Sequence, residues 1–393
     1  MSQPSTTSSS NNRFRYTLDG SDALENKIDE INRRVTEDIH KIVPTEKIDA
    51  LVLAGGYGRG EGGVYLRDGR EHLYNDLDYY LFLKGNKRAN EADYGAGLKA
   101  IEKARSPEAD CDVEFKIDSI TQLESSPVSM FSYDLVAKSY IADGNPSVFE
   151  NCSKHLDHSK IPPSEATRLL FNRCSGLIFS RDLLNQSELS DKDLEFVQRN
   201  FSKVELAMGD AILTVLGKYQ WSCQQRQRVL SETKPIPGIA NWDKVVGYHR
   251  NGVDFKFHPA HNAQSMEEHR RRYESIREAV KSIWFWVENQ RLGETLSDPL
   301  SYANAKTPRC PDQPRWRNLL VNIKQFGLGA LTQPHATLYQ RDLMYRAMGL
   351  LLWEDDSESA DRIKDQLSFL LRTKASNRAG FVKQYESLWH RFG

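Results

Sequence analysis

The sequence predicts an α+β protein in which a mixed-sheet α/β domain is followed by an all-helical domain. Short apolar runs of strand length, separated by glycine-rich or polar segments, occupy the chain up to about residue 150. After about Pro162, apolar residues recur at spacings of three and four over long stretches, which is the pattern of amphipathic helices. We therefore expect a disordered tail over residues 1–20, an α/β domain over residues 21–160 and a helical domain over residues 161–393.

The elements of the α/β domain can be placed from its apolar pattern. Ser21 and Asp22 offer N-cap oxygens to a helix whose apolar stripe runs from Leu24 to Ile39. A second helix is expected over residues 94–104. The predicted strands are short and rich in apolar residues, and they cover residues 50–54, 76–83 and 112–117.

The helical domain is expected to begin with a helix that Ser164 caps, followed by one that begins at Asp191. Prolines and glycines between residues 231 and 262 predict an irregular connection there. The remaining helices are predicted from apolar periodicity, at residues 266–290, 316–325, 336–353, 357–372 and 381–392.

Composition limits the classes of function. The 393 residues carry a formal net charge of −1, and 39% are hydrophobic, so the chain can bury a core, and binding to a long nucleic acid is possible but not favoured. The longest apolar runs fall short of the ~20 residues of a membrane span, and the polar N-terminus lacks a secretory signal. Five dispersed cysteines, none in a Cys-x-x-Cys pair, fit reduced thiols and no zinc site. We expect a soluble cytoplasmic protein without a membrane partner.

A glycine-rich turn follows the first predicted strand. The segment Gly55-Gly56-Tyr57-Gly58-Arg59 comes directly after Ala54, and further glycines stand at positions 60 and 62. Glycines let the backbone approach a ligand closely, and successive N–H groups in such a turn can bind an anion. Arg59 would add positive charge for phosphate oxygens.

Two predicted strands carry paired carboxylates. Asp76 and Asp78 lie two residues apart in the second strand, so they share one face, and Asp112 and Glu114 are placed in the same way in the third. Carboxylates that are close together repel one another unless a cation lies between them. Hard oxygen ligands at this spacing suit Mg²⁺ or Mn²⁺.

This order of features resembles the polymerase-beta-like nucleotidyltransferase superfamily. A strand that ends in Gly-Gly, a spacer, Asp-x-Asp in a second strand and one acid in a third is its pattern, and Gly58 to Gly62 is most similar to the minimal and aminoglycoside-type branch. The resemblance covers about residues 48–118, and the helical domain matches the general build of larger members. It implies a nucleotidyltransferase-fold domain and an Mg²⁺-dependent enzyme that moves a nucleoside monophosphate from an NTP, with ATP favoured, to a hydroxyl acceptor with release of pyrophosphate.

The resemblance also implies roles for individual residues. Asp76 and Asp78 would hold the metal, with Glu114 as the third acid and Asp112 as the alternative for that role. Nucleotide-binding residues would come from the turn and from one helical lysine: Gly55, Gly56, Tyr57, Gly58, Arg59 and Lys203. The sequence departs from the pattern in its long spacer, residues 57–75, where a hairpin turn at residues 67–70 would absorb the extra length, and in Gly56, where serine is common.

A second interpretation stays open. A chain can keep a fold after losing its chemistry, so the protein would then be a catalytically inactive module that binds a nucleotide or a partner. The acceptor is open as well: a small molecule, a protein side chain or an RNA end.

Overall fold

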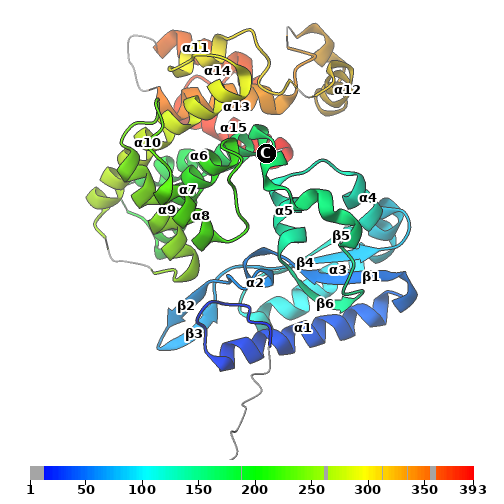
Figure 1. Ribbon diagram of the computed structural model, residues 1–393. Coiled ribbons are helices and arrows are strands. Elements are labelled where there is room, and N and C mark those ends of the chain that lie inside the picture. The colour runs from blue at the N-terminus through cyan, green and yellow to red at the C-terminus, as the bar shows by residue number, and fades with distance from the viewer. Residues whose placement is uncertain (1–12, 187, 261–263, 312, 334, 355–359) are drawn as a thin grey trace, which may run out of the picture. The chain divides into compact units, whose positions relative to one another are not determined.

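The chain forms two compact units in a computed structural model that describes residues 13–186, 188–260, 264–311, 313–333, 335–354 and 360–393 (Figure 1). The first unit holds residues up to Asp157, together with two short segments from later in the sequence, Trp221–Cys223 and Phe255–Ala260. The second unit begins at His158 and holds the rest. A small mixed sheet and a helical C-terminal region confirm the predicted α+β class.

The first unit is built on a four-stranded sheet with the strand order β5-β4-β1-β6. Its strands are β1 (Ile48–Leu53), β4 (Leu77–Leu83), β5 (Val113–Asp118) and β6 (Tyr140–Gly144). Strand β1 is antiparallel to both β4 and β6, whereas β4 and β5 are parallel. The three strands that the sequence predicts therefore lie side by side. The sequence pattern did not predict β6.

Helices cover both faces of this sheet (Figure 1). Leu77, Tyr79, Leu81 and Leu83 of β4 pack in one core with α1 (Asp22–Ile42) and α3 (Lys87–Ala109). The other face of β4 carries Asp78, Tyr80 and Phe82, and its core includes residues of α4 (Ile120–Ser125) and α5 (Met130–Ala137). The alternation predicted for this strand is thus confirmed, as is the cap of α1, where the Ser21 hydroxyl accepts a hydrogen bond from the Leu24 N–H at 3.3 Å.

The glycine turn and the spacer also have regular structure. A single-turn helix α2 (Gly55–Gly58) follows β1, and a hairpin of β2 (Val64–Arg67) and β3 (Arg70–Leu73) occupies the spacer. Asp68 and Gly69 form the hairpin turn with positive φ values of 52° and 72°. The hairpin predicted for residues 67–70 is therefore confirmed. Short 3₁₀ helices lie at η1 (Thr45–Lys47) and η2 (Glu150–Leu156).

Residues 13–20 do not behave as a tail. Tyr16 is fully buried, and its backbone N–H donates to the Glu25 carboxylate at 2.8 Å. The Tyr16 carbonyl in turn accepts from the N–H of Gly62 at 2.9 Å. The segment therefore packs against the glycine-rich region, and the rest of the expected tail, residues 1–12, lies outside the described residues.

The second unit is helical. Its helices, two of which have ends that belong to the first unit, are α6 (Pro163–Leu184), α7 (Asp191–Val215), α8 (Cys223–Glu232), α9 (Trp242–Phe257), α10 (Met266–Leu292), α11 (Pro299–Asn304), α12 (Arg315–Phe326), α13 (Gln340–Trp353), α14 (Ala360–Leu371) and α15 (Arg378–Phe392), with 3₁₀ turns η3 (His158–Lys160) and η4 (Leu328–Thr332). None of the helices in the described part of the chain has the length and apolar character that crossing a bilayer requires.

Two predictions for this unit are wrong. Residues 242–257, expected to be irregular, form α9. A Cβ at Gly252 would lie 2.4 Å from the Leu206 nitrogen of α7, so this glycine allows close helix packing and does not break the helix. Ser164 does not cap α6: Pro162 is the N-cap and Pro163 is the first helical residue, where a missing N–H costs nothing.

Candidate functional site

The glycine turn brings the end of β1 next to a carboxylate. Gly55 opens α2 with a φ of +65°, and a Cβ there would lie 2.9 Å from Asp78 Oδ2. At Gly58, a Cβ would lie 2.0 Å from the Leu53 carbonyl oxygen. Gly58 lets the turn fold back onto β1, and Gly55 lets the Asp78 carboxylate lie against the start of the turn; a side chain at either position would prevent this.

Tyr57 holds the turn from inside the core. Its ring is fully buried, its hydroxyl donates to the Gly63 carbonyl at 2.7 Å and accepts from the Tyr74 N–H at 2.9 Å. Burial raises the pKa of this phenol, so it stays neutral. The expected nucleotide contact of Tyr57 is therefore restricted to its backbone. Gly56 is partly exposed beside it, and a Cβ on Gly56 would lie 3.0 Å from the Glu61 carbonyl oxygen.

The parallel strands bring two of the predicted acids together. Asp78 of β4 and Glu114 of β5 are paired directly across the ladder. Asp76 and Asp112 each lie one residue before their strand, and both are exposed. The Asp112 carbonyl accepts the Leu77 N–H at 2.8 Å, which fixes the register. Asp78, with 34% of its side chain exposed, is the most enclosed of the four acids.

Opposing effects act on the charge of Asp78. Burial raises the pKa of its carboxyl, and the nearby Glu114 charge raises it further. The cations Lys116 and Arg59 lower it. The Lys116 ammonium lies 3.8 Å from Asp78 Oδ1, so this lysine provides part of the positive charge that the acid pair needs.

A cavity of about 220 Å³ opens beside Gly55 and Asp78. Strands β4 and β5 and helices α2 and α5 supply most of its lining, which consists of Ala54, Gly55, Arg59, Asp78, Tyr80, Lys116, Phe131, Asp134, Leu135 and Lys138. Three cations thus face two acids, and this excess of positive charge favours an anionic ligand.

Contacts inside this cavity orient two of its cations. Arg59 forms an ion pair with Asp134 of α5 at 3.1 Å, and both side chains are mostly buried. The Lys116 ammonium lies 5.5 Å from the centre of the Tyr80 ring. Tyr80 contacts Phe131 with ring centres 4.9 Å apart, so an aromatic wall adjoins the charged groups. Charged and aromatic surfaces side by side suit a ligand that has both a phosphate and a ring.

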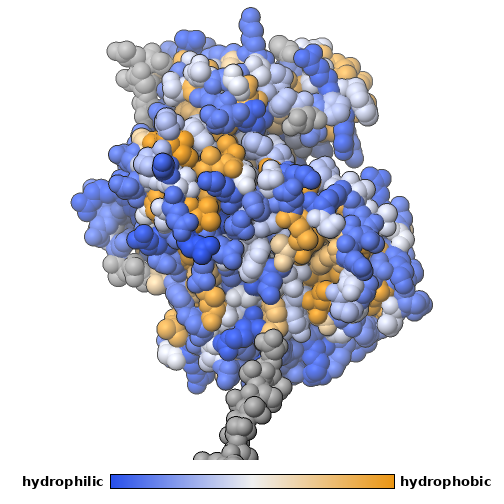
Figure 2. Space-filling model, in the orientation of Figure 1, coloured by the Kyte–Doolittle hydropathy of each residue, from blue (hydrophilic) through white to orange (hydrophobic). Residues whose placement is uncertain are grey.

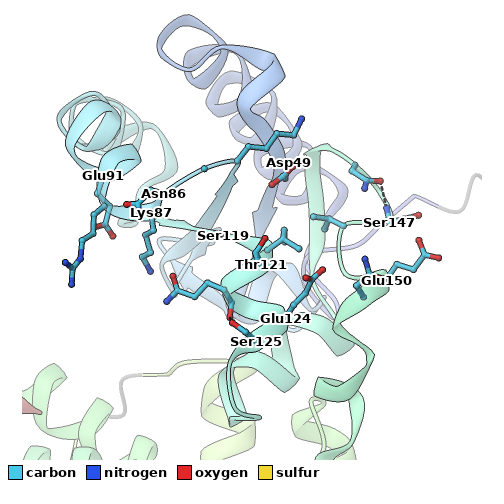
Figure 3. A pocket seen from close by; sticks show the side chains of 18 residues that line it. Asp49, Asn86, Lys87, Glu91, Ser119, Thr121, Glu124, Ser125, Ser147 and Glu150 are labelled. Carbon is cyan, nitrogen blue, oxygen red and sulfur yellow. Dashed lines mark hydrogen bonds between the residues drawn. The ribbon is translucent and has the colours of Figure 1, made fainter. Parts of the chain in front are cut away.

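A larger cavity of about 1230 Å³ lies at the opposite end of the sheet, where β4 and β5 end and β1 begins (Figure 3). Its labelled side chains include both acidic and basic residues, among them Asp49, Lys87 and Glu150. Lys87 forms an ion pair with Asp118 at 3.4 Å. The glycine turn and the paired acids do not line it. Size alone therefore does not single it out, and we take the smaller cavity as the candidate site.

The acids fit a magnesium ion in their chemistry. Mg²⁺ prefers oxygen ligands and is commonly held by one or two carboxylates, with waters and substrate phosphates completing its shell. Asp78 and Glu114 supply two such groups, and a cation between them would relieve the repulsion that raises the Asp78 pKa. Among the described residues, no group of three or more His, Cys, Asp or Glu side chains is placed to hold a metal. The assignment of Asp76, Asp78 and Glu114 as metal ligands stays a prediction.

Several residues of the site were missed by sequence reasoning. Lys116 could have been found, because it follows Glu114 by two residues in an alternating strand. Asp134 and Lys138 come from α5 and its C-cap, a segment without a chemical motif. Lys203, which the resemblance places at the nucleotide, is exposed on α7 and belongs to the helical unit.

Glu61 is a further residue that the sequence did not single out. It is 3% exposed, and its carboxylate accepts the Cys223 N–H at 3.0 and 3.2 Å. Cys223 belongs to the short segment Trp221–Cys223 of the first unit. Glu61 therefore anchors that segment beside the glycine-rich region and does not face the ligand cavity.

The comparisons with known proteins give no further guide. No protein-family model, no curated protein sequence and no solved structure matches this chain.

Proposed function

We propose that the protein is an Mg²⁺-dependent nucleotidyltransferase with a nucleotidyltransferase-fold first unit. The observation that carries this proposal is the direct pairing of Asp78 with Glu114 on parallel strands. The pair lies next to Gly55, a position that requires glycine because its φ is positive and a Cβ would meet the Asp78 carboxylate. The charged cavity beside Asp78 supports an NTP as the ligand. The order of strand, glycine turn, Asp-x-Asp strand and acid-bearing strand supports the fold.

The chain's own residues would divide the work of this reaction. Arg59, Lys116 and Lys138 would bind phosphate oxygens, since they place positive charge around the cavity. The backbone N–H group of Gly55, which lines the same cavity, would contribute to the anion site. Asp78 and Glu114 would hold Mg²⁺, with Mn²⁺ as a substitute and with Asp76 able to contribute. The bound ion supplies charge neutralisation for the phosphates.

The proposed reaction is an in-line displacement at phosphorus, in which the acceptor hydroxyl displaces pyrophosphate. The acceptor hydroxyl oxygen forms a bond to the α-phosphorus of the NTP, and the bond from that phosphorus to the oxygen that bridges to the β-phosphate breaks. Pyrophosphate leaves with the electron pair of the broken bond. The hydroxyl proton passes to a carboxylate, for which Glu114 is the first candidate and Asp112 the second. The helical unit is the candidate for selecting the acceptor.

One observation favours the inactive alternative. Lys116 already places a cation 3.8 Å from Asp78, so the acid pair has a partial counter-charge without any metal. In a nucleotide-binding module this ion pair would be sufficient. The two functions differ in whether Mg²⁺ and an NTP yield a product.

A pyrophosphate-release assay with each of the four NTPs, Mg²⁺ and a cell extract as acceptor source tests the proposal. We expect release by the parent and a loss of several powers of ten in Asp78→Asn and Glu114→Gln, because charge neutralisation and proton removal both depend on these acids. Asp118→Asn is the matched control, because Asp118 lies at the opposite end of the same strand as Glu114 and forms an ion pair with Lys87 there. No release by the parent, together with NTP-dependent thermal stabilisation, would favour the inactive module.

A further inference from the structure

Helix α12 (Arg315–Phe326) buries polar side chains and exposes large apolar ones. Its buried side chains are two asparagines, Asn318 and Asn322. The Asn322 amide donates to the carbonyls of Ala336 and Leu338 at 2.7 and 2.9 Å. The partly buried Val321 and Phe326 also pack against the core of the unit, whereas the largest apolar side chain of the helix, Trp316, is left exposed.

Four large apolar side chains of α12 and the adjoining η4 (Leu328–Thr332) point into solvent. They are Trp316, Leu320, Leu328 and Leu331, with exposed fractions of 67%, 58%, 73% and 50%. We call this set the α12 ridge. Figure 2 shows hydrophobic residues gathered where Figure 1 places α12. Each side chain is at least half exposed, so the set protrudes as a ridge and does not form the walls of a groove.

The surroundings of the α12 ridge are positively charged. Residues 315–333 contain three cations and no Asp or Glu. Arg315, Arg317 and Lys324 are all exposed. Arg391 adds a fourth cation, because its guanidinium donates to the Gln325 side chain at 2.5 Å and lies 5.5 Å from the centre of the Phe326 ring. Cations therefore flank the exposed tryptophan and leucines.

We propose that the α12 ridge docks on an anionic lipid surface. A short helix with Trp and Leu on one face and Lys or Arg beside them is the pattern of helices that lie in the membrane interface. Anionic headgroups complement four cations, and an acyl boundary accepts protruding side chains that a protein partner would have to match with pockets. The near-neutral net charge and the lack of long apolar runs, which argued against a membrane partner, concern the whole chain and do not exclude a local surface of this kind. The proposal does not depend on the nucleotidyltransferase activity.

Sedimentation with vesicles tests this proposal on the full chain. We expect binding to phosphatidylcholine vesicles that contain roughly 30% of the anionic lipid phosphatidylglycerol, and little binding to phosphatidylcholine alone, because basic side chains are attracted to a negatively charged surface. The double variant Trp316→Ser/Leu328→Ser should lower the bound fraction about tenfold or more, because each buried CH₂ group contributes to partition. Leu66→Ser is the matched control, since Leu66 of β2 is also 67% exposed but lies in the other unit, and it should bind as the parent does.

Three results would overturn the proposal. One is no binding by the parent. Another is binding that the Trp316→Ser/Leu328→Ser variant keeps, which would indicate charge adsorption alone. The third is self-association of the parent without lipid that this variant abolishes, which would assign the ridge to a second copy of the chain. Unchanged melting curves of the variants check that each has folded.

Discussion

Gly55→Ala tests how the glycine turn and Asp78 depend on each other. The substitution has two separable effects. An L-residue at a φ of +65° is strained by about 1–2 kcal/mol. In addition, the new Cβ would lie 2.9 Å from Asp78 Oδ2, where ordinary contacts begin at 3.4 Å. The carboxylate must therefore shift by about half an ångström, away from its place beside the turn.

Gly69→Ala separates these two effects. Gly69 has a φ of +72°, and a Cβ there would meet no described atom within 4 Å. Both variants should therefore lose about 1–2 kcal/mol of stability, or ~2–8 °C in melting temperature for a unit of this size. Only Gly55→Ala should also displace Asp78. A misplacement of half an ångström at a reacting centre costs about tenfold in rate.

The assay pairs melting curves with pyrophosphate release at saturating NTP and Mg²⁺. We expect similar melting shifts in the two variants and a loss of activity of about tenfold in Gly55→Ala alone. Equal activities of Gly55→Ala and Gly69→Ala would refute the reasoning that the approach of Asp78 to the turn matters for function.

Three further substitutions test the electrostatics and the anchoring contacts. Burial first, and then Glu114, raise the pKa of Asp78 above its ordinary 3.8, so the parent loses stability as the pH rises from 3.8 through the raised pKa. Asp78→Asn should therefore melt at a higher temperature than the parent at neutral pH and at the same temperature near pH ~3. An unchanged melting temperature at neutral pH would contradict this. Glu61→Ala should lower the free energy of unfolding by about 1–3 kcal/mol in urea titrations, because it leaves the Cys223 N–H buried without its acceptor; a change below the error of the titration would argue against the anchor. Asp342→Ala removes the partner of buried Arg346, 2.8 Å away, and should cost about 3–5 kcal/mol, whereas a surface-like cost under about 1 kcal/mol would count against a buried pair.

Local pattern predicted much of the first unit. Alternation along 76–83 placed Asp78 and the buried tyrosine and leucines on opposite faces, because the period of two is intrinsic to a strand. The turn at Asp68 and Gly69 was readable since glycine tolerates the positive φ that such turns need. The direct pairing of Asp78 with Glu114 depends on the register between two strands, which one sequence does not contain.

The errors have physical causes as well. Local propensity treats Gly252 as a helix breaker, although in α9 it makes room for the backbone of α7, a tertiary contact that propensity does not include. Asp134 joins the candidate site only because α5 packs over the sheet and brings it within 3.1 Å of Arg59. Tyr57 stands in the glycine segment, which suggests a ligand contact, but the fold uses its ring as core.

The central claim is that Asp78 and Glu114 hold a divalent ion beside an NTP at the glycine turn. A crystal structure with a non-hydrolysable NTP analogue and Mn²⁺, collected at a wavelength where manganese scatters anomalously, tests it most directly. We predict an anomalous peak between the Asp78 and Glu114 carboxylates, with the phosphates near Gly55 and Arg59. An NTP analogue bound in the cavity of Figure 3, or a phosphate chain in the predicted place without any manganese peak at these acids, would contradict the claim.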